Sequence, residues 1–356
     1  MLKSVAHVNL AKGFRGGERQ TVLLIKYLKY RNPEIHQYLI CRHNSEIKKY
    51  ITDIPDLSVI EVGCELQGHI ALANKADILQ AHEAKAVHWV AIHHLLYKIP
   101  YVITRRVPQP VSNNFFNRYS FSTASATIAI SNAIRESIIL SFGKDVNFSG
   151  KINLIYSVLA HMESNPQEVA KIKAQYANKF LIGHIGAYVD KHKGQKVLIP
   201  AAKRFIAKHP DARFIFLGNG RDEEELRKLT ADTPEIEWLG FKNNIVDYID
   251  SLNLFVFPSR NEGLGSVLLD IMDHRVPIVA SNVDGIPEIV KDHETGLLFP
   301  NGDSDSLYNS LEEIYASKDL QQSLVETAEK KLTRFKPEFQ ANYYTELYNQ
   351  ILENNN

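Results

Sequence analysis

The chain has 356 residues, which is long for one hydrophobic core and comfortable for two. Hydrophobic residues make up 44% of it and charged residues 23%, a composition that excludes disordered and fibrous proteins. Two cysteines, Cys41 and Cys64, in so long a chain are typical of unpaired thiols in a reducing compartment, so we expect a cytoplasmic protein. No uncharged apolar run reaches the roughly 18 residues of a membrane span, so any membrane contact is expected to be peripheral.

The net charge of zero conceals a difference between the two halves. Residues 1–160 contain 19 Lys and Arg against 11 Asp and Glu, and the remainder contains 22 against 30. A basic half suits an anionic partner, such as an anionic membrane surface or a phosphorylated glycan, although solvated surface charge gives the same balance. The basic excess is diffuse and no nucleic-acid-binding module accompanies it, so nucleic acid is not expected as a partner.

Apolar runs alternate with helical patterns along the first half. A strand at 4–10 is followed by a turn containing Gly16 and Gly17 and by a helix over 18–30, which is the opening of a βαβ unit. Further strands are expected at 37–41, 58–62, 78–81, 101–104, 127–130 and 152–156, and further helices at 84–97 and 131–142. The alternation predicts a parallel, doubly wound sheet.

The second half repeats this pattern. Strands are expected at 179–185, 213–217, 236–239, 254–257 and 277–280, with helices at 194–209, 222–229, 304–317 and, as one helical stretch, 319–352. The sequence thus predicts the α/β class with two Rossmann-like domains, 1–160 and 161–335, and a helix at 336–356 that can pack back on the first domain. Ligands of open parallel sheets bind outside the carboxyl ends of the strands, so site residues are expected in the turns that follow strands.

The most informative turn follows the strand at 254–257. Glu262 in this turn can accept hydrogen bonds from sugar hydroxyls, and a helix is expected to start near Ser266. The backbone N–H groups of Leu264, Gly265 and Ser266 can hold an anion. Asp270 lies eight residues after Glu262, about 80° past two full helical turns, so it is expected on roughly the same face and within reach of a ribose. Alternatively, Glu262 caps the helix and Asp270 is a solvated side chain.

The order of motifs resembles the donor-site signature of glycosyltransferase family 4. The resemblance is carried by Pro258-Ser259, Glu262-Gly263, an acidic residue eight positions on, and the segments 277–280 and 285–290. It extends to a glycine loop at 16–18, an interdomain strand at 151–158, a phosphate loop at 186–194 and a nucleobase element at 238–241. It implies the GT-B fold, in which two Rossmann-like domains face a central cleft, and a retaining, metal-independent transferase without a cofactor that uses a UDP- or GDP-sugar, with UDP favoured.

The resemblance also implies roles for single residues. His82, Lys193 and Glu262 are expected to be catalytic: Lys193 would meet the donor diphosphate and offset the charge on the leaving group, and His82 would contact the transferred sugar. Donor binding is expected to use Gly16 and Gly17 of the first domain. In the second domain the expected donor-binding residues are Gly186, Gly218, Gly240, Phe241, Arg260, Gly263, Leu264, Gly265, Ser266 and Asp270.

Two positions depart from the family pattern. Ala187 stands where arginine is usual, so either Arg260 or Arg15 supplies the missing cation or donor binding is weak. Asp270 stands where glutamate is usual. On the acceptor side, Arg105 and Arg106 suit a phosphate or carboxylate on the acceptor, or else they form the rim between the domains.

No metal site is expected. His88, His93 and His94 fall on one predicted helix without a matching set of metal ligands, so we interpret them as packing or surface groups.

The sequence therefore predicts a hexosyltransferase-type enzyme that acts on a glycan or lipid-linked acceptor in cell-surface polysaccharide or lipopolysaccharide synthesis, in the cytoplasm or at the inner face of the membrane. One alternative is a nucleotide-sugar epimerase or hydrolase of the same fold. Another is a catalytically weak binding or scaffold subunit, which the Ala187 and Asp270 departures favour.

Overall fold

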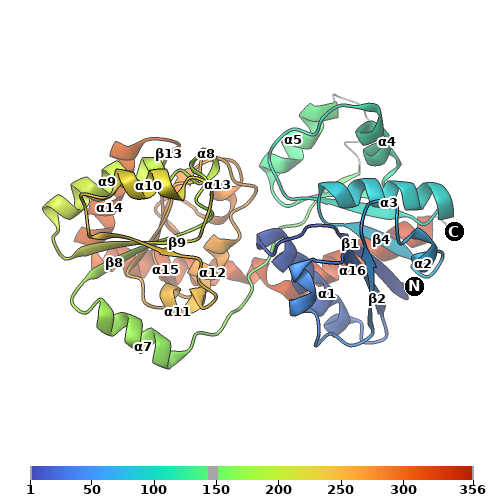
Figure 1. Ribbon diagram of the computed structural model, residues 1–356, viewed down its shortest axis with the longest axis horizontal. Helices are drawn as coiled ribbons and strands as arrows, with labels where there is room; N and C mark the ends of the chain where they lie inside the picture. Colours follow the sequence, from blue (N-terminus) through green and yellow to red (C-terminus); the bar gives the residue numbers. More distant parts are fainter. Residues whose placement is uncertain (1, 143–150, 355–356) are drawn as a thin grey trace. The chain divides into compact units, whose positions relative to one another are not determined.

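The computed structural model describes residues 2–142 and 151–354 and divides into two compact units. Unit 1 comprises Met1–Ala160 and Phe335–Asn356, and unit 2 comprises His161–Arg334. Each unit contains one parallel sheet with helices packed on it, as Figure 1 shows. The α/β class and the two parallel sheets expected from the sequence are thereby confirmed.

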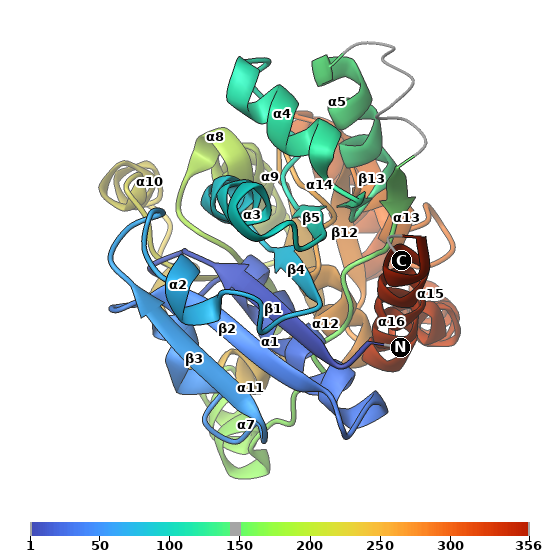
Figure 2. The same cartoon turned by 90° about the vertical axis from the view of Figure 1, so that its right-hand side faces the viewer.

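Unit 1 has a seven-stranded sheet in the order β3-β2-β1-β4-β5-β6-β7. Its strands are β1 (Ser4–Asn9), β2 (His36–Arg42), β3 (Leu57–Val62), β4 (Ile78–Ala81), β5 (Tyr101–Arg105), β6 (Ala126–Ala129) and β7 (Ile152–Leu154). The order reverses between β1 and β4, which lie side by side in Figure 2. The loops after these two strands therefore diverge to opposite faces and leave room for a ligand at the carboxyl edge of the sheet.

Helices cover both faces of this sheet. They are α1 (Gly16–Arg31), α2 (His69–Leu72), α3 (Ala84–Tyr97), α4 (Phe115–Thr123), α5 (Asn132–Phe142) and α16 (Pro337–Asn354), with a 3-10 turn at Glu46–Tyr50. The C-terminal helix α16 belongs to this unit and packs beside α1 (Figure 1). Its Tyr344 hydroxyl bonds the Thr104 hydroxyl at 2.9 Å, and its Tyr348 hydroxyl donates to Gln80 at 2.8 Å. Both tyrosines complete the core that Val5, Ile78 and Val102 form under the strands.

Unit 2 has a six-stranded sheet in the order β10-β9-β8-β11-β12-β13. Its strands are β8 (Phe180–Ile185), β9 (Ala212–Leu217), β10 (Ile236–Gly240), β11 (Leu254–Phe257), β12 (Ile278–Asn282) and β13 (Leu297–Pro300). Its helices are α7 (Pro166–Gln175), α8 (Asp190–Lys193), α9 (Gln195–Lys208), α10 (Glu223–Leu229), α11 (Ile245–Ile249), α12 (Val267–Asp273), α13 (Ile286–Ile289), α14 (Ser304–Ala316) and α15 (Lys318–Lys331). Here the order reverses between β8 and β11. All four residues of β11 are buried, as a central parallel strand requires.

Several expected boundaries are wrong. The helical stretch expected over 319–352 is interrupted: α15 ends at Lys331, a 3-10 turn occupies Leu332–Phe335, and α16 starts at Pro337, because proline is accepted in the first turn of a helix but not in its interior. The helix expected to start at Gly194 starts one residue later, since Gly194 adopts a left-handed conformation with φ of 66° and separates α8 from α9. The sequence analysis also missed the short helices α2, α4, α7, α11 and α13 and the strand β13.

Within the described residues, no helix is long and apolar enough to cross a membrane.

Candidate active site

Lys193 and Glu262 meet at the point in unit 2 where the strand order reverses. Lys193 ends α8, in the loop that follows β8, and Glu262 lies in the loop that follows β11. Their side chains form an ion pair with 2.5 Å between Nζ and Oε2, and they are 24% and 18% exposed. The Lys193 ammonium also lies 5.2 Å from the centre of the Phe257 ring. Two residues that are 69 positions apart in the sequence are thus brought into direct contact at the carboxyl edge of the sheet.

Close backbone contacts hold the two loops together. A side chain at Gly194 would place its Cβ 2.0 Å from the Pro258 carbonyl oxygen, so only glycine allows this approach. The Arg260 backbone N–H donates to the His192 carbonyl at 2.8 Å. The lysine loop is therefore fixed against the Pro258–Glu262 loop by the main chain, and the contact between Lys193 and Glu262 follows from this docking.

The segment after β12 supports Glu262 from the other side. The Asp284 carboxylate accepts from the Glu262 backbone N–H at 2.9 Å, and the Gly285 N–H donates to the Glu262 carbonyl at 3.3 Å. A Cβ at Gly285 would lie 2.2 Å from the Gly263 carbonyl oxygen. Gly263, Leu264 and Gly265 are buried in the turn that leads through Ser266 into α12. Glycine at position 285 thus has a structural reason in this chain, since it allows two loops to pack backbone to backbone.

Asp270 does not have the position that the helical count predicted. Residues 263–266 form a turn and α12 begins only at Val267, so Asp270 lies in the first helical turn, not two turns into a helix. Its side chain is buried, with 6% exposed. The alternative interpretation of Asp270 as a solvated side chain is therefore also wrong.

Arg260 lies in the same loop cluster as Lys193. Its guanidinium is 3.6 Å from the Asp190 carboxylate, and its side chain is 34% exposed. Arg15, the other residue considered as a replacement for the arginine missing at Ala187, is exposed in unit 1, immediately before α1. Of these two arginines, Arg260 is the one that shares a unit with Lys193.

The remaining expected donor residues of unit 2 lie at or just after the ends of β8, β9 and β10. Gly218 has φ of 151°, and a Cβ there would lie 1.9 Å from the Gly186 carbonyl oxygen. The Gly218 N–H donates to the Gly240 carbonyl at 2.9 Å, and Phe241, the next residue, is 66% exposed. Gly186, Gly218 and Gly240 therefore join three neighbouring strand ends, while Phe241 offers an exposed ring beside them.

In unit 1 the expected residues also lie where the strand order reverses. His82 follows β4 directly, and its backbone N–H donates to the Val8 carbonyl of β1 at 3.0 Å. Gly16 and Gly17 follow β1 and form the first residues of α1, two residues before the expected helix start. The Arg15 N–H donates to the Glu18 carboxylate at 2.9 Å, which fixes the start of this helix.

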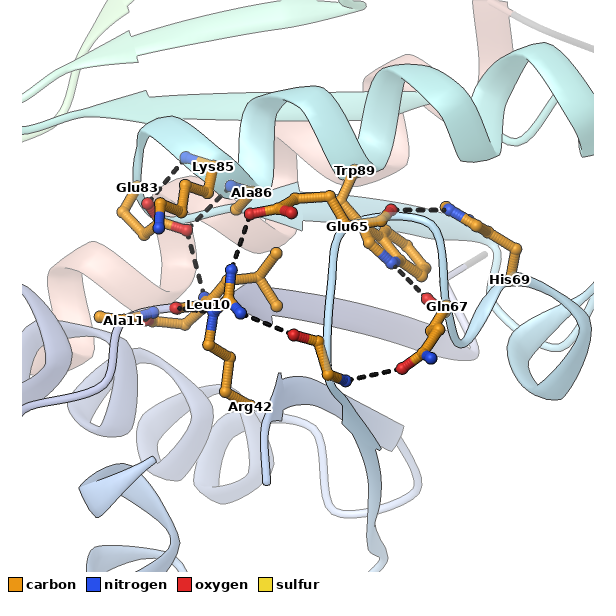
Figure 3. A network of polar contacts seen from close by, with 12 residues as sticks. Leu10, Ala11, Arg42, Glu65, Gln67, His69, Glu83, Lys85, Ala86 and Trp89 are labelled. Carbon is orange, nitrogen blue, oxygen red and sulfur yellow. Dashed lines mark hydrogen bonds and ion pairs between the residues drawn. The ribbon is translucent and has the colours of Figure 1, made fainter. Parts of the chain in front are cut away.

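Glu83, the residue after His82, belongs to the polar network that Figure 3 shows. Glu83 caps α3 by accepting from the N–H groups of Lys85 and Ala86 at 2.7 and 2.8 Å, and it also accepts from the Leu10 N–H at 3.1 Å. The Arg42 guanidinium joins the same region by donating to the Leu10 carbonyl and the Glu65 carboxylate. The ends of β1, β2 and β4, next to which His82 lies, are thereby tied together.

The His82 imidazole is buried and neutral. Its Nε2 lies 3.0 Å from Nδ1 of His7, and only 2% of the side chain is exposed. Burial, followed by the nearby His7 and the positive charge of Arg106, lowers the pKa of His82 well below 6.5. Arg106 follows β5, and its Cδ is 3.7 Å from the position that a Cβ at Gly17 would take. The structure therefore gathers His82, Gly17 and Arg106 within unit 1.

Arg105 of β5 and the three histidines of α3, His88, His93 and His94, have hydrogen-bond partners in unit 1. Arg105 donates to the Gln109 carbonyl, and His88 bonds the Asn117 side chain at 3.1 Å. His93 is fully buried and bonds the Ala73 carbonyl at 3.0 Å, and His94 bonds the Ile99 carbonyl at 2.8 Å. Within residues 2–142 and 151–354, no three His, Cys, Asp or Glu side chains form a group that could hold a metal ion.

The sequence analysis missed His7, Gln37 and Asp284. His7 and Gln37 are polar residues within strands whose other residues are mostly apolar, and both are fully buried. A buried polar residue in a central strand requires a partner, and that requirement was the available signal. Which partner it has depends on strand pairing, which the sequence does not give.

Comparison with known proteins gives a family match in unit 2 and a fold match over the whole chain. Residues 167–331 match the model of the family "Glycosyl transferases group 1". The capsular polysaccharide biosynthesis glycosyltransferase CapM of Staphylococcus aureus is 25% identical over 65% of this chain, and the match spans 63% of CapM, less than two thirds of its length. The lipopolysaccharide core biosynthesis glycosyltransferase LpsE of Rhizobium meliloti is 23% identical over 80% of this chain and 78% of its own.

Among solved structures, Anabaena HepE in complex with UDP and glucose superposes with a TM-score of 0.81 at 20% identity, over 98% of this chain and 100% of HepE. This likeness concerns the fold, and it agrees with the GT-B architecture expected from the sequence. Residues 167–331 are fewer than half of the chain, so this match shows that unit 2 resembles the glycosyl transferases group 1 family, while the likeness to HepE shows the fold.

Proposed function

We propose that this chain is a retaining glycosyltransferase that moves a sugar from a UDP-linked donor to a hydroxyl group of a glycan or glycolipid, in the synthesis of a cell-surface polysaccharide or lipopolysaccharide. The observation that carries the proposal is the contact between Lys193 and Glu262 where the strand order of unit 2 reverses. This is the position at which open parallel sheets bind nucleotides. Choice of a UDP-sugar is supported by HepE, whose structures hold UDP, UDP with glucose, and UDP-glucose.

Lys193 would stabilise the leaving group. As the bond from the sugar to the diphosphate breaks, negative charge accumulates on the diphosphate, and an ammonium group at that position lowers the barrier. Without donor, Glu262 holds this ammonium at 2.5 Å. When a donor binds, its diphosphate would compete for Lys193, and the Glu262 carboxylate would become available to accept hydrogen bonds from sugar hydroxyls. Arg260 would add a second cation near the diphosphate, in place of the one missing at Ala187.

Retention would follow from attack on the face of the sugar that the diphosphate leaves. The acceptor hydroxyl would give its proton to the departing phosphate, so no protein nucleophile and no separate general base are required. The acceptor classes follow from the names of CapM and LpsE, which concern capsular polysaccharide and lipopolysaccharide core. The basic excess of residues 1–160 fits an enzyme that works in the cytoplasm beside the anionic inner face of a membrane.

Thermal-shift measurements test the donor class. We expect UDP and UDP-glucose to raise the melting temperature more than GDP, ADP and their sugars, because a ligand at 100 times its Kd stabilises the folded state by about 2.7 kcal/mol. Transfer is then measured by mass spectrometry with the stabilising sugar nucleotides and lipid-linked acceptors from cells. Absence of both stabilisation and transfer across the panel contradicts the proposed function. Release of free or epimerised sugar without acceptor indicates a hydrolase or epimerase instead.

A further inference from the structure

The side chains of His184 and Gln195 form a buried polar cluster next to the loop that carries Lys193. His184 lies near the end of β8, and Gln195 is the first residue of α9. Their side chains are 1% and 0% exposed, so water does not compete for their hydrogen bonds. The Gln195 amide nitrogen lies 2.9 Å from the Ala187 carbonyl oxygen and 3.3 Å from Nε2 of His184. Nδ1 of His184 lies 3.1 Å from the Val256 carbonyl oxygen of β11.

Carbonyl groups at both ends fix the direction of these hydrogen bonds. A carbonyl oxygen only accepts, so the Gln195 amide must present its nitrogen to Ala187, and the same nitrogen then faces His184. Nε2 of His184 is therefore an acceptor, and the Val256 carbonyl independently requires a proton on Nδ1. Burial lowers the pKa of His184 to about 4, so near neutral pH its ring carries only this one proton. The Gln195 amide oxygen has no hydrogen-bond partner among the described residues, so no bond on that side favours the opposite orientation.

The bond from Gln195 to Ala187 closes the loop around Lys193. It joins the two ends of residues 187–195, and Lys193 lies within this closed segment. The position that a Cβ at Gly186 would take is 3.5 Å from both Nε2 of His184 and Cδ of Lys193, so these two side chains are neighbours. The direction in which the lysine stem leaves the main chain thus depends on the shape of the closed segment.

We propose that Gln195 and His184 are positioning residues for Lys193. Gln195 closes the segment 187–195, and the neutral His184 holds the Gln195 amide in the orientation that this closure needs. Both side chains are inaccessible to a substrate, so they act only through Lys193. The effect on sugar transfer rests on the proposed function, whereas the direction of the hydrogen bonds and the coupling to the ion pair of Lys193 and Glu262 do not.

Nitrogen NMR of the ligand-free chain labelled with ¹⁵N-histidine tests the direction of the bonds. At neutral pH we expect His184 to carry its proton on Nδ1 and to have an unprotonated Nε2, with assignment from a His184→Asn variant. A proton on Nε2 of His184 in the wild-type protein overturns the proposal, because Gln195 could not then donate to it. This measurement requires no substrate.

Coupling to Lys193 is measured in the ligand-free protein through the Glu262 carboxylate. In Gln195→Met the closing bond is lost, and we expect the ¹³C resonance of the Glu262 carboxylate to move toward its value in Lys193→Met, where the ion pair is absent. Gln195→Glu, which keeps the shape of the side chain but does not donate when ionised, gives the same test if Gln195→Met does not fold. Gln321→Met is the matched control, since the Gln321 amide of α15 also donates to a carbonyl of this unit, that of Ile314 at 2.6 Å. An unchanged Glu262 resonance in a folded Gln195 variant overturns the positioning role.

A double-mutant cycle tests whether Gln195 acts on transfer through Lys193. We expect Gln195→Met to lower the transfer rate with the best donor by about 10- to 100-fold, because a misplaced group loses most of its effect on the reaction. In a protein that already carries Lys193→Met, the same substitution should lower the rate by less than about twofold, since the group that it positions is gone. A full additional loss in the double variant overturns the positioning role, because Gln195 would then act independently of Lys193. Failure of every sugar nucleotide to bind or react contradicts the proposed function instead, and the Glu262 resonance still decides the positioning role.

Discussion

At the scale of single residues, the main feature of unit 2 is the ion pair of Lys193 and Glu262, which the donor diphosphate would replace under the proposed function. Lys193 and Glu262 are each only about one fifth exposed, so their contact is stronger than that of a surface pair. Removing one partner leaves the other charge poorly solvated. Binding of a diphosphate to Lys193 can therefore offset much of the loss of this contact, provided that sugar hydroxyls reach Glu262.

Lys193→Met should abolish most of the activity. Loss of one preorganised group that stabilises developing charge typically lowers the rate by about 10²- to 10³-fold, and we expect a fall of this order in kcat/KM with the best donor. Lys228→Met is the control, because Lys228 is 73% exposed on α10 and forms an ion pair with Glu224 within the same helix. Normal activity of Lys193→Met would remove this residue from the catalytic site while leaving the fold and family intact.

Two glycines in the same loop cluster should respond differently to alanine. Gly218 has φ of 151° and no room for a Cβ, which would lie 1.9 Å from a backbone oxygen, so Gly218→Ala should destabilise unit 2 by roughly 1 to 3 kcal/mol. At Gly186 the nearest atoms to an added Cβ are 3.5 Å away, which is ordinary contact, so Gly186→Ala should leave stability nearly unchanged. Urea unfolding of the two variants checks the difference. Equal stability losses would show that glycine is required at both positions or at neither.

At the scale of elements, helix α16 completes unit 1 although it comes from the other end of the chain. Its buried side chains lie against residues of β1, β4 and β5, and two of its tyrosines bond polar side chains of the sheet. A 3-10 turn at Leu332–Phe335 separates α16 from α15. The chain therefore passes from unit 2 to unit 1 within a few residues. The core of unit 1 is thus incomplete without α16.

Tyr348→Ala should therefore destabilise unit 1 strongly. Tyr348 is fully buried, and truncation of a buried aromatic side chain typically reduces the free energy of unfolding by about 3 to 5 kcal/mol. Tyr343→Ala on the same helix removes the same group from a side chain that is 60% exposed, and we expect less than about 0.5 kcal/mol. Calorimetry measures the loss of stability in both variants. A small loss in Tyr348→Ala would contradict the packing of α16 on this unit.

At the scale of the whole molecule, both units contain fully buried neutral histidines. Burial lowers the pKa of His7 and His93 in unit 1 and of His184 in unit 2 from 6.5 to about 4. Each is at most 1% exposed. Such a group binds its proton more readily in the unfolded chain than in the folded one, so it makes stability depend on pH in both units.

Stability should be highest above pH 6.5 and should fall as the pH decreases from 6.5 toward 4. In this window the unfolded chain takes up protons that the folded chain excludes, and each histidine should lower the free energy of unfolding by roughly 2 kcal/mol at pH 5 relative to pH 8. Melting temperatures from pH 5 to 8 check this for the wild type. His184→Asn should reduce the slope, whereas His43→Gln, which changes an exposed imidazole, should not. A flat profile would mean that these rings are protonated in the folded state.

Much of the fold could be predicted because local patterns record it. The strand at 78–81 and the helix at 84–97 coincide with β4 and α3, since a short, mostly apolar run and a long helical pattern need no distant information. Short helices such as α7 were missed, although Asn165 as N-cap and Pro166 in the first turn were visible signals. The position of Asp270 was wrong because a helical count was extended through a turn.

The sequence by itself determined the class of the fold and the turns that follow its strands, where the expected site residues lie, because hydrophobic periodicity, glycines and prolines act over a few residues. Only the tertiary structure decided which of those turns meet. The order of strands brings Lys193 to Glu262, and it brings Gln37 of β2, His7 of β1 and His82, which follows β4, next to one another. The direction of the hydrogen bonds through these three residues depends on a carbonyl of α1, which accepts from Gln37. Such contacts join residues far apart in the chain, and packing of the core selects them, so no local pattern records them.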